Sequence, residues 1–144
     1  MKKILLLLTL AIATMANAQV DKMLGYWNTF DDKTGDMASC VKISENNGTY
    51  TCVVQNLSEK KPDGTYKVMK PPYPKGFENV VGSQLFIEMK AHKDQLKGKV
   101  YDPESRKTYF GKVTYEAKTD QLVLRGSLDK AGLLGRSQTW KRKK

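Results

Sequence analysis

The segment Leu122–Arg142, LVLRGSLDKAGLLGRSQTWKR, constrains the fold of this chain more than any other stretch. Apolar and polar residues alternate along residues 122–126 and again along 134–140, on either side of the turn-forming residues 129–132. This alternation is typical of two half-buried antiparallel strands. One face of the second arm carries Leu134, Arg136, Gln138, Trp140 and Arg142. Because a buried arginine must be paired or stacked, this arm either closes a core around a structural cation or lines a cavity with a polar base.

Shorter alternating runs fill much of the remaining chain. We predict further strands at residues 24–30, 37–44, 49–56, 83–90, 95–101 and 107–116. Turn signals separate these runs, and no helical period of about twelve residues or more interrupts them. About eight strands joined mostly by short turns form an antiparallel meander, and closure into a barrel removes its exposed edges. The predicted fold is therefore all-β, an antiparallel meander closed into a barrel.

The N-terminus has the pattern of a secretory signal peptide. Lys2 and Lys3 precede an apolar run that ends at the small-residue motif Ala16-Asn17-Ala18. A membrane anchor is the alternative, but this run is short for a membrane span and polar residues interrupt it. We predict a signal peptide at residues 1–18 with cleavage after Ala18, a periplasmic or secreted location, and no membrane-spanning segment. Residues 19–144 then form a single domain.

The mature chain is basic. Cleavage removes two of the 25 basic residues and none of the 15 acidic ones, which leaves a net charge of +8. Half of this charge lies in the basic tail, residues 141–144. An exported protein meets little nucleic acid, so we expect no nucleic-acid partner and consider anionic envelope surfaces instead. The alternative is a solvated tail that only keeps the protein soluble. The sequence does not indicate an oligomeric state.

Cys40 and Cys52 are candidates for a disulfide, because an exported protein meets oxidising conditions. They flank a turn signal, so they lie on adjacent strands of a hairpin. A five-residue loop at 44–48 places them opposite each other, whereas a four-residue loop at 45–48 places Cys40 opposite Val53. Apolar parity points Cys40 outward and Cys52 inward. Both alternatives stay open.

Residues 57–82 form the longest irregular segment and contain four of the five prolines. This proline content excludes a central strand through the segment. Loops of this length in a compact domain usually act as lids, as binding loops or as disordered excursions.

The inventory of reactive side chains predicts no enzyme. His92 is the one histidine and lies in a polar turn, so no catalytic triad is indicated. Metal-ligand spacing and a glycine-rich phosphate loop do not occur, so we expect no metal and no cofactor. Asp102 and Glu104 belong to a D-P-E turn, which explains both residues as turn formers. An enzyme that uses Asp102 and Tyr101 is the weakest of the alternatives.

Two groups of motifs carry family resemblances. Gly25-Tyr26-Trp27 is similar to the G-x-W signature of lipocalin and calycin barrels. Residues 100–109, residues 122–126 and the segment LGRSQTW at 134–140 resemble the bacterial exported family known as domain of unknown function 2147 (DUF2147). Ser105-Arg106 and Cys52 depart from glycines that are usual in that family. The resemblance implies a small lipocalin-like barrel in the periplasm or outside the cell, without an established enzymatic activity. In lipocalins a basic residue of the last strand packs across the tryptophan.

A barrel of about eight strands has room for side chains or for one small ligand. Parity predicts that these residues point inward: Trp27, Leu85, Ile87, Met89, Leu96, Val100, Tyr109, Val113, Leu122, Leu124, Leu134, Arg136, Gln138 and Trp140. This mixture suits a small apolar or amphipathic molecule. The candidate ligand-binding residues are Trp27, Tyr109, Arg136, Gln138 and Trp140, with Arg136 meeting a carboxylate or phosphate.

Two alternatives accompany this prediction. Arg136 or Arg142 instead stacks on Trp27 and plugs the barrel. At the level of function, the alternative is a non-catalytic module that binds the envelope or another protein through its basic outer surface and its long loop.

Overall fold

The computed structural model describes residues 18–144, and the predicted signal peptide lies outside this part of the chain except for Ala18. A helical turn at residues 18–21 leads into nine strands. Their bounds are β1 Gly25–Phe30, β2 Met37–Asn46, β3 Thr49–Lys60, β4 Tyr66–Val68, β5 Phe86–His92, β6 Gln95–Asp102, β7 Lys107–Glu116, β8 Gln121–Ser127 and β9 Gly135–Arg142. No helix among residues 18–144 is long and apolar enough to cross a membrane.

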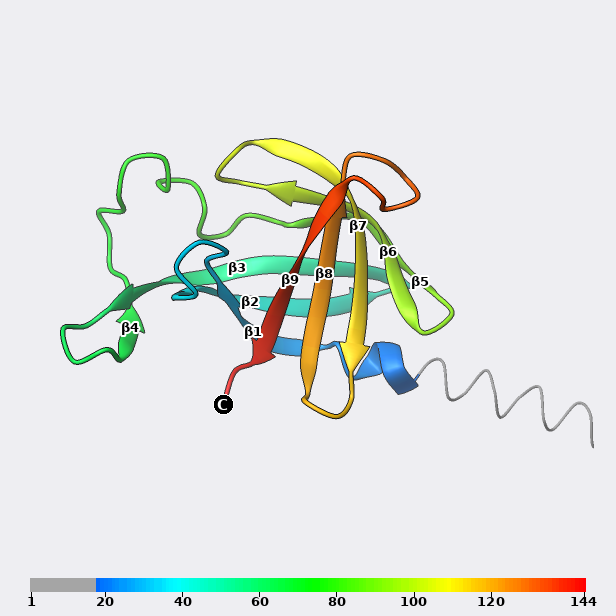
Figure 1. Cartoon of the computed structure of the whole chain (residues 1–144), viewed down its shortest axis with the longest axis horizontal. Helices are drawn as coiled ribbons and strands as arrows, with labels where there is room; N and C mark the ends of the chain where they lie inside the picture. Colours follow the sequence, from blue (N-terminus) through cyan, green and yellow to red (C-terminus); the bar gives the residue numbers. More distant parts are fainter. Residues whose placement is uncertain (1–17) are drawn as a thin grey trace, which may run out of the picture.

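Eight of the strands close into an antiparallel barrel in the order β1-β2-β3-β5-β6-β7-β8-β9 (Figure 1). The first and last strands pair directly, with Trp27 opposite Arg142 and Asn28 opposite Lys141. Strand β4 stands apart from the barrel and pairs only with the end of β3. Closure leaves the barrel without free edges, since each of its eight strands pairs with a neighbour on both sides. The predicted closed barrel is confirmed.

One seam of the barrel depends on a side chain. Strands β3 and β5 pair over two residues only, Thr49 with Lys90 and Tyr50 with Met89. Beyond these pairs, the backbone of residues 82–85 continues the seam with three hydrogen bonds to Cys52 and Val54, and the side chain of Gln84 adds a fourth. Its Oε1 accepts a hydrogen bond of 2.6 Å from the Cys52 amide, which a regular ladder would otherwise satisfy.

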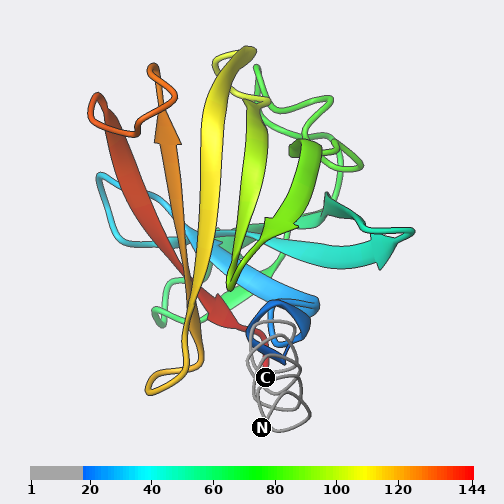
Figure 2. The same ribbon diagram turned by 90° about the vertical axis from the view of Figure 1, so that its right-hand side faces the viewer.

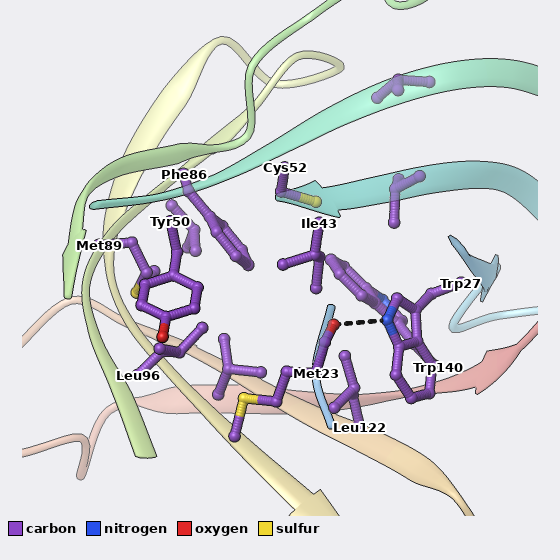
Figure 3. Packing of buried hydrophobic residues seen from close by; sticks show 14 of the residues in the cluster. Met23, Trp27, Ile43, Tyr50, Cys52, Phe86, Met89, Leu96, Leu122 and Trp140 are labelled. Atoms are coloured by element: carbon purple, nitrogen blue, oxygen red, sulfur yellow. Dashed lines mark hydrogen bonds between the residues drawn. The ribbon is translucent and has the colours of Figure 1, made fainter. Parts of the chain in front are cut away.

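The barrel interior is filled by apolar side chains (Figure 3). The largest fully buried ones are Trp27, Trp140, Met23, Ile43, Met89, Leu96 and Leu122. Met23 comes from the segment just before β1 and places its carbonyl 2.8 Å from the Trp27 Nε1, which donates a hydrogen bond to it. Each of these side chains is at most 2% exposed, so the interior around the two tryptophans is solidly packed.

Strand β5 departs from strict alternation. The prediction placed Leu85, Ile87 and Met89 on one inward face, but Phe86 and Met89 are the buried residues and Ile87 is 37% exposed. A bulge lies between Ile87 and Lys90, and Glu88 within it has a φ of 49°. A bulge inserts an extra residue and so reverses the parity on one side of it. The expectation that Ile87 points inward was wrong for this reason.

The hairpin that carries the cysteines has a shorter turn than either predicted loop. Asn46 pairs with Thr49, so only Asn47 and Gly48 form the turn, both with positive φ as a tight hairpin requires. With a bulge between Cys40 and Val41, Cys40 comes to lie opposite Asn56 and Cys52 opposite Ile43. Both thiols are free and buried, and burial raises the pKa of each. Only Cys52 joins the core cluster, in agreement with the predicted parity.

The long segment at 57–82 is partly ordered into strands. Strand β3 runs on to Lys60 and forms a hairpin with β4, which lies at an edge as the proline content requires. The following residues return to the barrel, where Met69, Tyr73, Phe77 and Val81 pack against the core. The segment is therefore a β-hairpin followed by a covering loop.

Candidate functional site

One end of the barrel is closed by Arg142 and the helical turn. The guanidinium carbon of Arg142 lies 4.2 Å from the centroid of the Trp27 ring, a cation–π arrangement. Its Nη1 and Nη2 donate hydrogen bonds to the carbonyls of Leu24 and Lys22, at 3.2 and 2.6 Å. Its Nε donates to Asp120 at 2.8 Å. Arg142 therefore seals this end, which we call the closed end.

The carboxylate of Asp120 depends on that arginine. Arg142 first, and then the hydroxyl of Tyr115 at 2.8 Å, hold the pKa of Asp120 below its ordinary value. The hydrogen bond to Asp120 raises the pKa of Tyr115 in turn. Asp120 lies in the turn between β7 and β8, and its two donors come from β7 and from the end of β9. Both pKa shifts therefore arise from structural pairing around this turn.

A second polar group lies farther from the closed end, where the β1–β2 loop lies beside strand β9 (Figure 2). A chain of contacts leads outward from the core. The Trp140 Nε1 donates to Gln138 Oε1 at 3.3 Å, and Gln138 Nε2 donates to Asp32 at 3.2 Å. The Arg136 Nη1 lies 3.6 Å from the same Asp32 oxygen. We call Asp32, Arg136 and Gln138 the polar cluster.

Further groups face the barrel interior near the polar cluster. Thr29 and Ser39 are cross-strand partners whose hydroxyl oxygens lie 2.6 Å apart, both nearly buried. On the other side, Tyr109 and Leu124 are only half-buried. Gly126 pairs with Arg136, and a Cβ added to it would meet nothing closer than 3.7 Å. This end thus combines hydroxyls, a phenol and an amide with room for a methyl group at Gly126.

The five predicted ligand-binding residues divide into two groups. Trp27 and Trp140 are 0% and 2% exposed, so they form the packed base of the barrel. Tyr109 and Gln138 are half-buried near the polar cluster, and the side chain of Arg136 is 77% exposed. Of the two arginines considered for stacking on Trp27, Arg142 fills that role. Leu134, which was expected to point inward, is 66% exposed in the β8–β9 connection.

Two hollows on the described part of the molecule lie outside the barrel. The first has a volume of about 340 Å³ and lies between the covering loop and the β6–β7 turn, with Glu78, Tyr101 and Arg106 in its wall. The second, of about 440 Å³, lies at the closed end beside Arg142 and Tyr115. The guanidinium of Arg142 already donates hydrogen bonds to Lys22, Leu24 and Asp120. We therefore assign the second hollow a structural role and not a ligand-binding one.

Residues 18–144 do not assemble a recognisable catalytic or metal centre. They contain no group of three or more metal-ligating side chains. His92 is exposed at the end of β5. Asp102 accepts hydrogen bonds from the Glu104 amide and the Ser105 hydroxyl, which are turn contacts. Asp102 has the predicted turn role, whereas His92 is the last residue of β5 and not part of the turn.

Sequence reasoning missed Asp32, Thr29 and Ser39. Asp32 belongs to a loop that reads only as a turn, and its partner Gln138 is 106 residues away. The signal was nevertheless available, because the predicted pairing of the first and last strands brings this loop beside the last strand. The two hydroxyls follow from the pairing of β1 with β2, since Thr29 has the inward parity of Trp27 and Ser39 lies opposite it.

Comparisons with known proteins agree with this architecture. A family model described as "Uncharacterized protein conserved in bacteria (DUF2147)" matches residues 25–142. Among solved structures, the chain is similar to one described as "Protein HP1028 from the human pathogen Helicobacter pylori belongs to the lipocalin family". That similarity has 26% sequence identity and a TM-score of 0.58, and it covers 85% of this chain and 83% of the other. No curated protein matches the chain. The predicted resemblance is confirmed: the chain has a lipocalin-like barrel and belongs to the DUF2147 family.

Proposed function

We propose that the protein is an exported, non-catalytic binding protein for a small apolar or amphipathic molecule, which it holds at the barrel end near the polar cluster. The observation that carries this proposal is the contrast between the two ends. Arg142 and Met23 seal one end, whereas Tyr109, Leu124 and Gln138 stay partly exposed at the other. Partly apolar surface with a few polar groups is what a small-molecule site requires.

The head group of such a ligand meets Arg136. This side chain is 77% exposed, and its separation of 3.6 Å from Asp32 makes a weak ion pair. A carboxylate or phosphate of the ligand replaces Asp32 at little cost, because the guanidinium forks around two oxygens at once. The apolar part then lies over Leu124 and Tyr109, beside Gly126, where the strand carries no side chain. Trp27 and Trp140 form the base beneath it.

Native mass spectrometry of the purified mature protein tests the proposal, with decanoate as an added probe. We expect a one-to-one complex that Arg136→Gln weakens and Gly126→Val abolishes. The valine Cβ would make ordinary van der Waals contacts with Val100 and Tyr109, and the valine methyl groups would cover the surface that the ligand requires. Circular dichroism checks that this variant still folds. Arg106→Gln in the outer hollow is the matched control and leaves binding unchanged. Binding that is insensitive to Gly126→Val, or lost in Arg106→Gln, contradicts the proposed site.

Export is part of the same proposal. The basic start, the apolar run and the Ala16-Asn17-Ala18 motif support a cleaved signal peptide. N-terminal sequencing of the protein from a bacterial periplasmic fraction should begin at Gln19. Recovery of the uncleaved chain in the cytoplasm contradicts export, and it leaves the binding site to be judged separately.

A further inference from the structure

A row of cations crosses the outer face of the barrel. Lys90 on β5 pairs with Lys97 on β6, Lys97 pairs with Lys112 on β7, and Lys112 pairs with Arg125 on β8. The four positively charged side chains thus occupy directly opposed positions on four neighbouring strands, over about 15 Å at the usual strand spacing. The three lysines are exposed. We call these four residues the cationic row.

The cationic row has no acidic partners. Residues 18–144 form four ion pairs, and none of them involves the row or the neighbouring Lys99. Like charges directly opposite each other destabilise a sheet, so three successive pairs of this kind oppose folding. Asp129 attracts Arg125 at one end of the row, but the three lysines form none of the ion pairs of residues 18–144. An external anionic surface would offset the repulsion among these positively charged side chains.

The β8–β9 loop adds exposed apolar side chains next to this row. Leu128, Leu133 and Leu134 are 72%, 81% and 66% exposed, the most exposed large apolar side chains of residues 18–144. We call residues 128–134 the leucine loop. Single exposed leucines are common, but three in one short loop are not explained by chance exposure.

The leucine loop is held in place by hydrogen bonds. The carboxylate of Asp129 accepts from the amides of Leu133 and Leu134 at 3.0 and 2.7 Å, which also lowers its pKa. The amide of Leu128 donates to the Leu134 carbonyl at 2.9 Å. A loop fixed in this way presents its leucines to solvent in one arrangement, so their exposure is built into the structure.

Arg125 joins the two features. Its Nε donates to the Gly132 carbonyl at 2.6 Å and its Nη2 to the Leu133 carbonyl at 3.5 Å. The last cation of the row therefore supports the loop that carries the leucines. A cationic face that continues into a fixed apolar tip matches the interface of an anionic bilayer, where headgroup phosphates lie above acyl chains.

We propose that the cationic row and the leucine loop together dock the protein onto the surface of an anionic lipid bilayer. The leucines enter the headgroup region and the lysines lie against lipid phosphates. The row alone is compatible with any polyanion, but the leucines favour a bilayer because a soluble polyanion offers them no apolar environment.

Vesicle co-sedimentation of the mature protein tests the proposal. We expect binding to vesicles of equal parts phosphatidylglycerol and phosphatidylcholine, no binding to pure phosphatidylcholine, and weakening by salt. The double variant K97Q/K112Q should bind about 30-fold more weakly, from the typical contribution of each basic residue near such a surface. The double variant L133S/L134S should lose roughly tenfold or more. Circular dichroism confirms that each variant is folded.

Two controls separate the docking face from general basicity. K75Q/K118Q removes the same charge from exposed positions elsewhere, and K143Q/K144Q removes charge from the tail. Both control variants lose two positive charges outside the cationic row, so both should bind within about twofold of the wild type. Equal losses in all three lysine pairs overturn the docking face. Wild-type-like binding by L133S/L134S, with equal affinity for soluble dextran sulfate, replaces the bilayer by a polyanion and overturns the proposal.

Discussion

Arg142 lies over the ring of Trp27, with its guanidinium carbon 4.2 Å from the ring centroid. The two residues are directly paired across β1 and β9, so this contact spans the closure of the barrel. The same guanidinium donates to two backbone carbonyls before β1 and to Asp120 in the turn between β7 and β8. One side chain thus ties together the first strand, the last strand and the helical turn.

Replacing Arg142 should destabilise the whole barrel. Arg142→Lys keeps the charge but cannot reproduce the planar stacking and the three separate hydrogen bonds, so we expect a loss of about 2 kcal/mol in the free energy of unfolding. Urea denaturation measures this loss. Arg136→Lys is the control, because Arg136 is 77% exposed and its change should stay within about 0.5 kcal/mol. Equal effects of the two substitutions would show that Arg142 has no special role.

Asp120 should contribute to stability only above acidic pH. Arg142 and Tyr115 lower its pKa in the folded state below the ordinary value of 3.8. Its contribution is therefore fully present above that value and is lost as the pH falls through the lower folded pKa. The free energy of unfolding, measured from neutral to strongly acidic pH, should fall less steeply in Asp120→Asn than in the wild type. Parallel curves would exclude this linkage.

Two inward-facing glycines should differ in their response to alanine: the substitution should destabilise the protein at Gly98 but hardly at Gly126. A Cβ at Gly98 would lie 2.7 Å from the Glu88 carbonyl and 2.8 Å from the Met89 Cα, both backbone atoms of the β5 bulge. Gly98→Ala should cost about 2 kcal/mol, because the bulge cannot move away easily. A Cβ at Gly126 would make only ordinary van der Waals contacts, at 3.7 Å from Val100 and 3.8 Å from Tyr109, so Gly126→Ala should stay within about 0.5 kcal/mol of the wild type. Thermal unfolding of both variants checks this contrast, and a mild Gly98→Ala would argue against the bulge.

The seam between β3 and β5 should weaken when Gln84 is shortened. Gln84→Ala leaves the Cys52 amide without its acceptor, and we expect a loss of about 1 kcal/mol. Hydrogen exchange at the Cys52 amide should accelerate as the seam opens locally. Gln55→Ala is the matched control, because Gln55 is an exposed glutamine on β3, the strand that carries Cys52. Unchanged exchange at Cys52 in Gln84→Ala is the result that would contradict this role.

The sequence predicted the strands well because most of them alternate cleanly. Strand β7 was predicted with its observed bounds, and the pairing of the first and last strands followed from the G-x-W motif. The exceptions have local causes. The β5 bulge reverses parity at Ile87, and a bulge leaves no signal in an apolar run. The two-residue turn at Asn47-Gly48 is a strong hairpin signal, but it was read as part of a longer loop.

The candidate site was harder to predict. Parity placed Gln138 and Arg136 on the inward face, yet parity does not say how far along the barrel the packed core extends. Arg136 lies beyond that core and is exposed, whereas Trp140 on the same face is buried. Asp32 completes the polar cluster from a loop whose sequence predicts only a turn. The exposure of Arg136 and the position of Asp32 both depend on how distant segments of the chain pair in the folded barrel, which the local sequence does not show.

The most direct test of the proposed function is amide chemical-shift mapping by NMR, with decanoate added to the mature protein. The proposed site predicts saturable shifts at the amides of Tyr109, Gly126 and Gln138, with small shifts at Val113 in the packed base and at Tyr101 beside the outer hollow. Shifts that gather at Tyr101 and Arg106, or at Asp120 and the closed end, would contradict a ligand site at the polar cluster.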